Sequence, residues 1–111
     1  MKKVNSIEEF IKEAKNLEEK MIRIQPYISS NEKFPCLRME AKNIFYDRSI
    51  DKEFENPKDA EDFIQKLSLD LGNELSHLGF YVIVSDLKYL KKRAETLEED
   101  DIKYLLHGFY E

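Results

Sequence analysis

The N-terminal part of the chain carries apolar residues at spacings of three and four, with charged residues between them. Ser6 and Glu9 have the spacing of a capping box, and Pro26 disfavours helix in the residue before it. The pattern predicts an amphipathic helix over residues 6–24, although Ile22 also lies in an alternating pattern typical of a short strand. The apolar stripe consists of Ile7, Phe10, Ile11, Ala14, Leu17, Met21 and Ile24.

A second amphipathic helix is predicted over residues 57–78. Asn56 is a favourable N-cap, Pro57 suits the first helical position, and Gly79 is typical of the residue that follows a helix. The predicted core-facing stripe consists of Ala60, Phe63, Ile64, Leu67, Leu71, Leu75 and Leu78.

The segment between these helices is consistent with two structures. Apolar and polar residues alternate from Leu37 to Lys42, and Ile44 begins a second run of good strand formers, which predicts a hairpin through Lys42 and Asn43. Leu37, Ala41, Ile44 and Arg48 also fit one face of a helix.

The apolar run at residues 80–84 favours the hairpin. Its apolar character on both sides predicts a strand covered on both faces, and the backbone of a buried strand needs sheet partners. The interval 34–54 is the best supplier of such partners, so we expect strands there.

Together these elements predict one α+β domain spanning residues 1–111. We expect a small, mostly antiparallel sheet, made of a hairpin within 34–54 plus strand 80–84. Amphipathic helices 6–24 and 57–78 pack on this sheet, and short C-terminal helices follow it. A second capping box, Thr96 with Glu99, begins the last of these short helices.

Composition narrows the class of protein. The 111 residues carry a net charge of −5, which disfavours nucleic-acid binding, and seven Phe and six Tyr disfavour disorder. Cys36 is the single cysteine, so we expect a cytoplasmic protein without an intramolecular disulfide. No signal peptide or membrane-spanning run is predicted. The abundance of Lys and Glu suggests a bacterial or phage origin.

The three glycines lie too far apart to form a phosphate-binding loop or a nucleophile elbow. No cofactor is expected, and no catalytic residue is assigned.

The strongest candidate binding cluster is basic, with an aromatic ring that could stack on a partner. It consists of Lys88, Tyr89, Lys91, Lys92 and Arg93. An acidic partner or a nucleic acid could dock there. The alternative is a solvated helix face neutralised by Glu95, Glu98 and Glu99.

Asp86 follows the apolar strand directly, where α/β enzymes often place a metal ligand. With carboxylates from residues 47–55 it could hold Mg²⁺ for hydrolysis of a phosphoester or nucleotide. The alternative reading is a helix N-cap, and no metal ligand is assigned.

Other candidates have ordinary structural explanations. The acidic run at residues 98–101 could mimic nucleic-acid phosphates, but it also suits the first turn of a helix. His77 and His107 suit helix C-termini, and Cys36 could pair with either, although a lone cysteine usually behaves as a small buried hydrophobe.

The stripe of helix 6–24 also follows a heptad rhythm for three repeats, which could form a homodimeric coiled coil. Packing on the sheet explains the same residues.

The sequence therefore favours a small cytosolic protein-binding module of the inhibitor, immunity or phage interaction type. It would dock on another protein through aromatic anchors such as Tyr27, Phe34, Tyr46 or Tyr110. The alternatives are the Mg²⁺-dependent hydrolase with Asp86, and nucleic-acid binding through residues 88–93.

Overall fold

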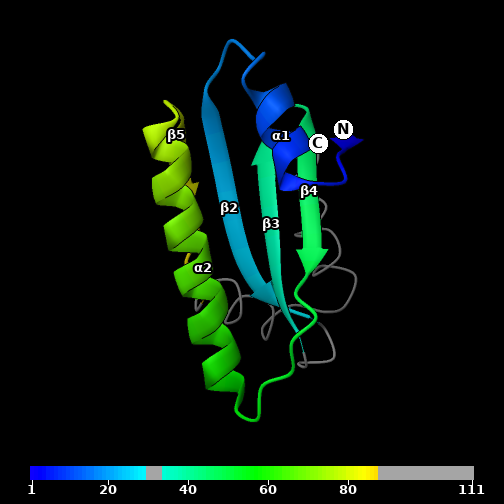
Figure 1. The fold of residues 1–111 in the computed structure, drawn as a ribbon, viewed down its shortest axis with the longest axis vertical. Coiled ribbons are helices and arrows are strands. Elements are labelled where there is room, and N and C mark those ends of the chain that lie inside the picture. The colour runs from blue at the N-terminus through cyan, green and yellow to red at the C-terminus, as the bar shows by residue number, and fades with distance from the viewer. Residues whose placement is uncertain (30–33, 88–111) are drawn as a thin grey trace, which may run out of the picture.

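The structure is a computed structural model, which describes residues 1–29 and 34–87 (Figure 1). In chain order its elements are β1 (Lys2–Lys3), α1 (Ile7–Ala14), β2 (Met21–Ile28), β3 (Pro35–Ala41), β4 (Ile44–Ser49), α2 (Pro57–His77) and β5 (Tyr81–Val84). The five strands form one mixed sheet beside two helices, so the predicted α+β class is confirmed for the described residues. The short C-terminal helices expected from the sequence lie outside these residues.

The strand order in the sheet is β1-β4-β3-β2-β5. β3 is antiparallel to both of its neighbours, whereas β1 pairs with β4 and β5 pairs with β2 in parallel. Where the sequence predicts a mostly antiparallel sheet, the described sheet is mixed, with two antiparallel and two parallel pairings. The physical reason is that each helix connects two strands that run in the same direction, and parallel strands need such a crossover.

The helix predicted over residues 6–24 is wrong in its second half. α1 ends at Ala14, and Met21 already begins β2, which lies between β3 and β5. Ile22 and Ile24 are fully buried in the sheet, while Arg23 between them is exposed. The alternating reading of this tail was the correct one, because a central strand satisfies its backbone groups on both edges.

The coiled coil considered for a homodimer requires a helix that is not formed. Phe10 and Ala14 of α1 are buried in the protein's own core, and the later heptad positions belong to β2. The continuous helix over residues 6–24 that such a dimer would use is therefore not formed.

β3 and β4 form an antiparallel hairpin in the interval 34–54. Ala41 pairs with Ile44 across the two-residue turn at Lys42 and Asn43. Leu37, Met39 and Ala41 are buried, as their alternation predicts for one face of a strand. The helical alternative for this segment is wrong.

Both helices cover the same face of the sheet, called here the helix face (Figure 1). α1 contacts β4, and α2 contacts β2, β5 and β3. The core fills this face. Its strand residues are Ile22, Ile24, Leu37, Met39, Ala41, Ile44 and Tyr46. The opposite side carries the alternate residues of the same strands. It is called here the open face because neither α1 nor α2 covers it.

α2 has the ends that the sequence predicts. The side chain of Asn56 accepts a hydrogen bond from the N–H of Lys58 at 2.9 Å, and Pro57 follows the cap. At the other end the N–H of Phe80 donates to the carbonyl of Leu75, and Gly79 adopts a φ of 96°. This is a Schellman cap, whose left-handed position favours glycine.

The residues that α2 buries against the sheet differ from the leucine stripe that the sequence predicts. Its buried residues are Ala60, Ile64, Ser68, Gly72 and Leu75, whereas Leu78 is 51% exposed. A Cβ added at Gly72 would lie 3.2 Å from Cγ2 of Val84, so glycine allows a close approach of helix and sheet. Ser68 satisfies its buried hydroxyl by donating to the carbonyl of Ile64 at 2.7 Å.

β5 forms within the predicted segment, but its surroundings were predicted wrongly. It pairs with β2 rather than with the hairpin, and it lies at the edge of the sheet. Tyr81 is 68% exposed and Ile83 is 36% exposed, so only the helix face of β5 is covered. α2 brings the chain back so that β5 runs parallel to β2. β5 therefore lies beside β2, outside the hairpin of β3 and β4.

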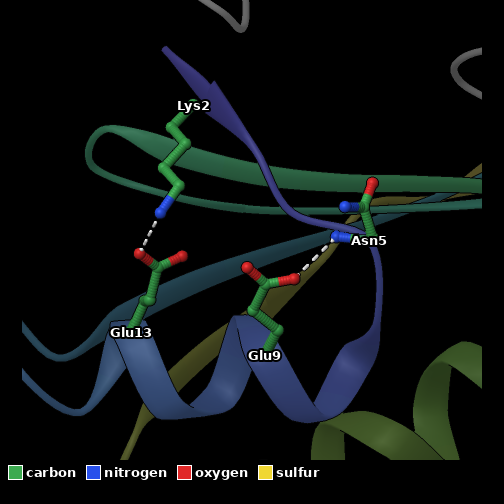
Figure 2. A network of polar contacts seen from close by, with 4 residues as sticks. All are labelled: Lys2, Asn5, Glu9 and Glu13. Atoms are coloured by element: carbon green, nitrogen blue, oxygen red, sulfur yellow. Dashed lines mark hydrogen bonds and ion pairs between the residues drawn. The ribbon is translucent and has the colours of Figure 1, made fainter.

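A small polar network joins β1 to α1 (Figure 2). Lys2 Nζ donates to Glu13 Oε1 at 2.6 Å, and this carboxylate raises the pKa of Lys2. The N–H of Glu9 donates to Ser6 Oγ at 3.1 Å, which is half of the predicted capping box. The Glu9 carboxylate accepts from the N–H of Asn5 rather than of Ser6. The second hydrogen bond of the box is thus shifted by one residue, from the N–H of Ser6 to that of Asn5.

Among the described residues there is no helix with the length and apolarity that a bilayer-spanning segment requires.

The close approach at Gly72 predicts a large effect of a bulky side chain. We expect Gly72→Leu to lower the free energy of unfolding by about 1–3 kcal/mol, because the side chain would overlap Val82 and Val84. Asn73→Leu is the matched control, since Asn73 is exposed on the same helix. Urea unfolding of both variants measures the difference, and equal stabilities would contradict the packing described here.

Candidate functional site

The basic cluster predicted from the sequence, Lys88, Tyr89, Lys91, Lys92 and Arg93, lies outside the described residues. The same holds for the acidic run at 98–101, for His107 and for Tyr110.

Asp86 lies just past β5 and is exposed. β5 and β4 are separated by β2 and β3, so Asp47 on β4 lies three strand intervals from β5, roughly 14 Å at about 4.8 Å per interval. Within residues 1–29 and 34–87, no group of three or more His, Cys, Asp or Glu side chains could hold a metal ion. The sheet order therefore does not bring Asp86 and Asp47 together.

Cys36 and His77 lie on opposite sides of the sheet. Cys36 is buried on the open face of β3, whereas His77 is exposed at the end of α2 on the helix face. Burial raises the pKa of the Cys36 thiol, and its S–H donates to the carbonyl of Phe34 at 3.6 Å. Cys36 and His77 therefore do not meet as nucleophile and base, and the thiol stays protonated at neutral pH.

The predicted aromatic anchors are mostly used inside the protein. Tyr46 is 5% exposed and belongs to the core, so it is wrong as an anchor. Tyr27 and Phe34 are half-buried. The strongly exposed aromatic ring of the described residues is instead Tyr81, which the sequence pattern placed in a covered strand.

The open face contains a regular arrangement of polar side chains on the three central strands. The strand registers place these residues in rows, which are Tyr27-Cys36-Ser49, Gln25-Arg38-Asp47 and Arg23-Glu40-Phe45. Gln25, Cys36 and Arg38 are buried here. The alternation of Leu37, Met39 and Ala41 already implied that Arg38 and Glu40 share the other face, but their neighbours depend on register.

Tyr27 and Asp47 form a short side-chain contact on this face. The Tyr27 hydroxyl donates to Asp47 Oδ1 at 2.7 Å across the width of β3. Burial raises the pKa of Tyr27, and the hydrogen bond and negative charge of Asp47 raise it further. The phenol is therefore a permanent donor that ties β2 to β4, rather than an acid or base.

Arg38 lies at the centre of the rows. Its guanidinium carbon lies 5.1 Å from the centroid of the Phe45 ring, and Nε lies 4.0 Å from Glu40 Oε2. Burial lowers the pKa of Arg38 to about 10, and it raises the pKa of the Glu40 carboxyl. The nearby carboxylates favour the charged guanidinium, which remains protonated at neutral pH.

A hollow of about 220 Å³ lies on the helix face, and it is called here the helix-face hollow. Its apolar lining consists of Ile7, Leu37, Tyr46, Ile50, Leu67 and Leu71. Arg48 of β4 and the carboxylates of Asp70 and Glu74 complete the lining. Asp70 and Glu74 are four residues apart on α2 and therefore share one side of the helix. The four-residue spacing of these carboxylates is visible in the sequence, but the sequence prediction for this helix considered only its leucine stripe.

The outer edge of β5 is the second surface that the described residues leave available for binding. The N–H of Tyr81 donates to the carbonyl of Lys20, directly before β2, and the N–H of Ser85 donates to the carbonyl of Ile24 in β2. Because donors alternate along a strand, the main-chain groups of Val82 and Val84 point away from β2. No described strand pairs with this edge.

Comparisons of the chain with protein-family models, with curated proteins and with solved structures find no match.

The Tyr27–Asp47 contact predicts a pH-dependent loss of stability in Tyr27→Phe. At pH 7 we expect a loss of about 1–2 kcal/mol, because a hydrogen bond to a charged acceptor is removed. The raised pKa means that this contribution is fully present below the ordinary tyrosine value of 10.0 and decreases at higher pH.

Urea unfolding from pH 7 to pH 11 measures this effect. Tyr81→Phe is the control, because Tyr81 is 68% exposed, and we expect a change within about 0.5 kcal/mol. Equal losses in both variants at pH 7 would show that the contact with Asp47 contributes nothing.

The burial of Cys36 predicts a slow reaction with a thiol reagent. We expect 5,5′-dithiobis(2-nitrobenzoate) to react roughly a hundredfold more slowly with the folded protein than with the urea-unfolded chain, since reaction requires an exposed thiolate. Stopped-flow absorbance measures both rates. Similar rates would mean that the open face does not bury this residue.

Proposed function

We propose that the protein is a protein-binding module that docks by adding an extended strand of its partner to β5. The observation that carries this proposal is the outer edge of β5, with which no described strand pairs, together with the exposed Tyr81 and Ile83. In strand addition, main-chain hydrogen bonds supply affinity and alternate side chains supply specificity.

The chemistry of the edge favours an extended polypeptide. Val82 and Val84 each present an N–H and a C=O in the sheet plane, and only another strand complements such a row. The strand Tyr81–Val84 contains no charge and no proline. Natural proteins usually protect exposed edges with such residues, so an unprotected edge is typical of a pairing site.

The side chains beside this edge add an apolar contact on one face. Tyr81 and Ile83 both point to the open face, because Val82 and Val84 contact α2 at Gly72. A partner strand would place alternate side chains against this tyrosine and isoleucine. Tyrosine is enriched among residues that dominate binding energy, because it combines a large apolar area with few rotatable bonds.

The experiment measures amide hydrogen exchange in β5 by NMR. In the free protein we expect the Val82 and Val84 amides to exchange at least about tenfold faster than the Ile83 amide, which faces β2. Peptides selected for binding from a display library of extended sequences should protect Val82 and Val84 and leave the helix-face hollow unchanged.

Two variants make the test specific. Tyr81→Lys places a charge beside the edge and should weaken the selected peptides about tenfold. Ser49→Lys is the control, because Ser49 is exposed at the end of β4, which β3 and β2 separate from β5. Bound peptides that leave the exchange of Val82 and Val84 unchanged, or that tolerate Tyr81→Lys, would contradict strand addition. Protection that depends on protein concentration alone would identify a second copy instead.

A further inference from the structure

We propose that the helix-face hollow binds one apolar side chain of a partner protein, flanked in that partner by lysine or arginine. This site goes beyond strand addition at β5 and does not depend on it. The two sites use different elements, because the hollow is lined by α1, β3, β4, α2 and Ile50, and none of its residues belongs to β5.

The size and lining of the hollow fit a single aliphatic or aromatic side chain. Its volume of about 220 Å³ is below the range of roughly 300–1,000 Å³ that is usual for small-molecule pockets. Protein interfaces characteristically place one anchor residue in a well-packed pocket of the partner. Ile7 and Leu71, one from each helix, are half-buried and leave apolar surface accessible there.

The charges around the hollow favour a basic neighbour of that anchor. Asp70 and Glu74 are exposed carboxylates one turn apart, opposed by the single cation of Arg48, so the lining carries a net charge of −1. None of these three side chains forms an ion pair within the described part of the chain. The carboxylates of Asp70 and Glu74 are thus available to a lysine or arginine of a partner.

The same charges disfavour a second copy of this chain as the occupant. Leu69 is an exposed leucine that a second copy could insert, since it is 50% exposed on α2. Asp70 follows it directly, so insertion would bring Asp70 of one copy toward Asp70 and Glu74 of the other. Like charges at an interface oppose association.

Three capped tripeptides test the proposal with the intact protein. The probe is acetyl-Lys-Leu-Lys-amide, and its controls are acetyl-Lys-Ala-Lys-amide, which lacks the anchor, and acetyl-Glu-Leu-Glu-amide, which reverses the charge. Methyl and amide NMR titrations measure binding. We expect the probe to shift the methyl signals of Leu37, Leu67 and Leu71, and both controls to bind about tenfold more weakly.

Charge-removing variants separate the carboxylates from the general negative charge of the protein. Asp70→Asn/Glu74→Gln should weaken the probe about three- to tenfold and abolish the preference over acetyl-Glu-Leu-Glu-amide. The matched control, Glu53→Gln/Asp62→Asn, removes two exposed carboxylates outside the hollow and should leave binding unchanged. All four positions are exposed, so we expect both variants to fold.

Several results would overturn this assignment. These are equal binding of the leucine and alanine peptides, unchanged binding by Asp70→Asn/Glu74→Gln, and shifts confined to residues outside the hollow. Binding of n-butylamine as tight as that of the tripeptide would identify a free amine as the ligand. Shifts that follow protein concentration without peptide would identify a second copy. Each result leaves strand addition at β5 to be judged by its own exchange measurement.

Discussion

Both edges of β2 carry main-chain hydrogen bonds, to β3 in antiparallel and to β5 in parallel, and the rest of the described fold depends on this pairing. Ile22 and Ile24 are fully buried, and a buried backbone group without a partner costs about 1–3 kcal/mol. Residues 21–28 therefore form a strand, and α1 has to end before them. The chain returns through α2 in parallel to β2, which places β5 at the edge.

This arrangement divides the molecule into surfaces with different chemistry. The helix face contains the core and the hollow beside α1 and α2. The open face holds rows of polar side chains fixed by Tyr27, Asp47 and Arg38. The edge of β5 offers main-chain groups next to Tyr81 that no strand of residues 1–29 and 34–87 pairs with. The proposed binding sites use the hollow and this edge, so α2 supports both by holding β5 and by supplying Asp70 and Glu74.

Local signals in the sequence predict part of this structure. Asn56, Pro57 and Gly79 define the ends of α2, because capping involves neighbouring residues alone. The period of the N-terminal stripe is ambiguous, since Met21, Ile24 and Ile28 fit a helix whereas Ile22 and Ile24 fit a strand. Long-range pairing with β3 and β5 decides between them. The rows of the open face and the lining of the hollow depend on register and sheet order, which no local pattern contains.

The backbone conformation of residues 15–28 tests the central claim, that β2 is an interior strand, most directly. Secondary 13Cα chemical shifts and inter-strand nuclear Overhauser effects measure it in solution. The account predicts helical shifts that end near Ala14, strand shifts over Met21–Ile28, and contacts between Ile22 and Val82 and between Ile24 and Val84. Helical shifts that continue through Ile24, without contacts to β5, would contradict it.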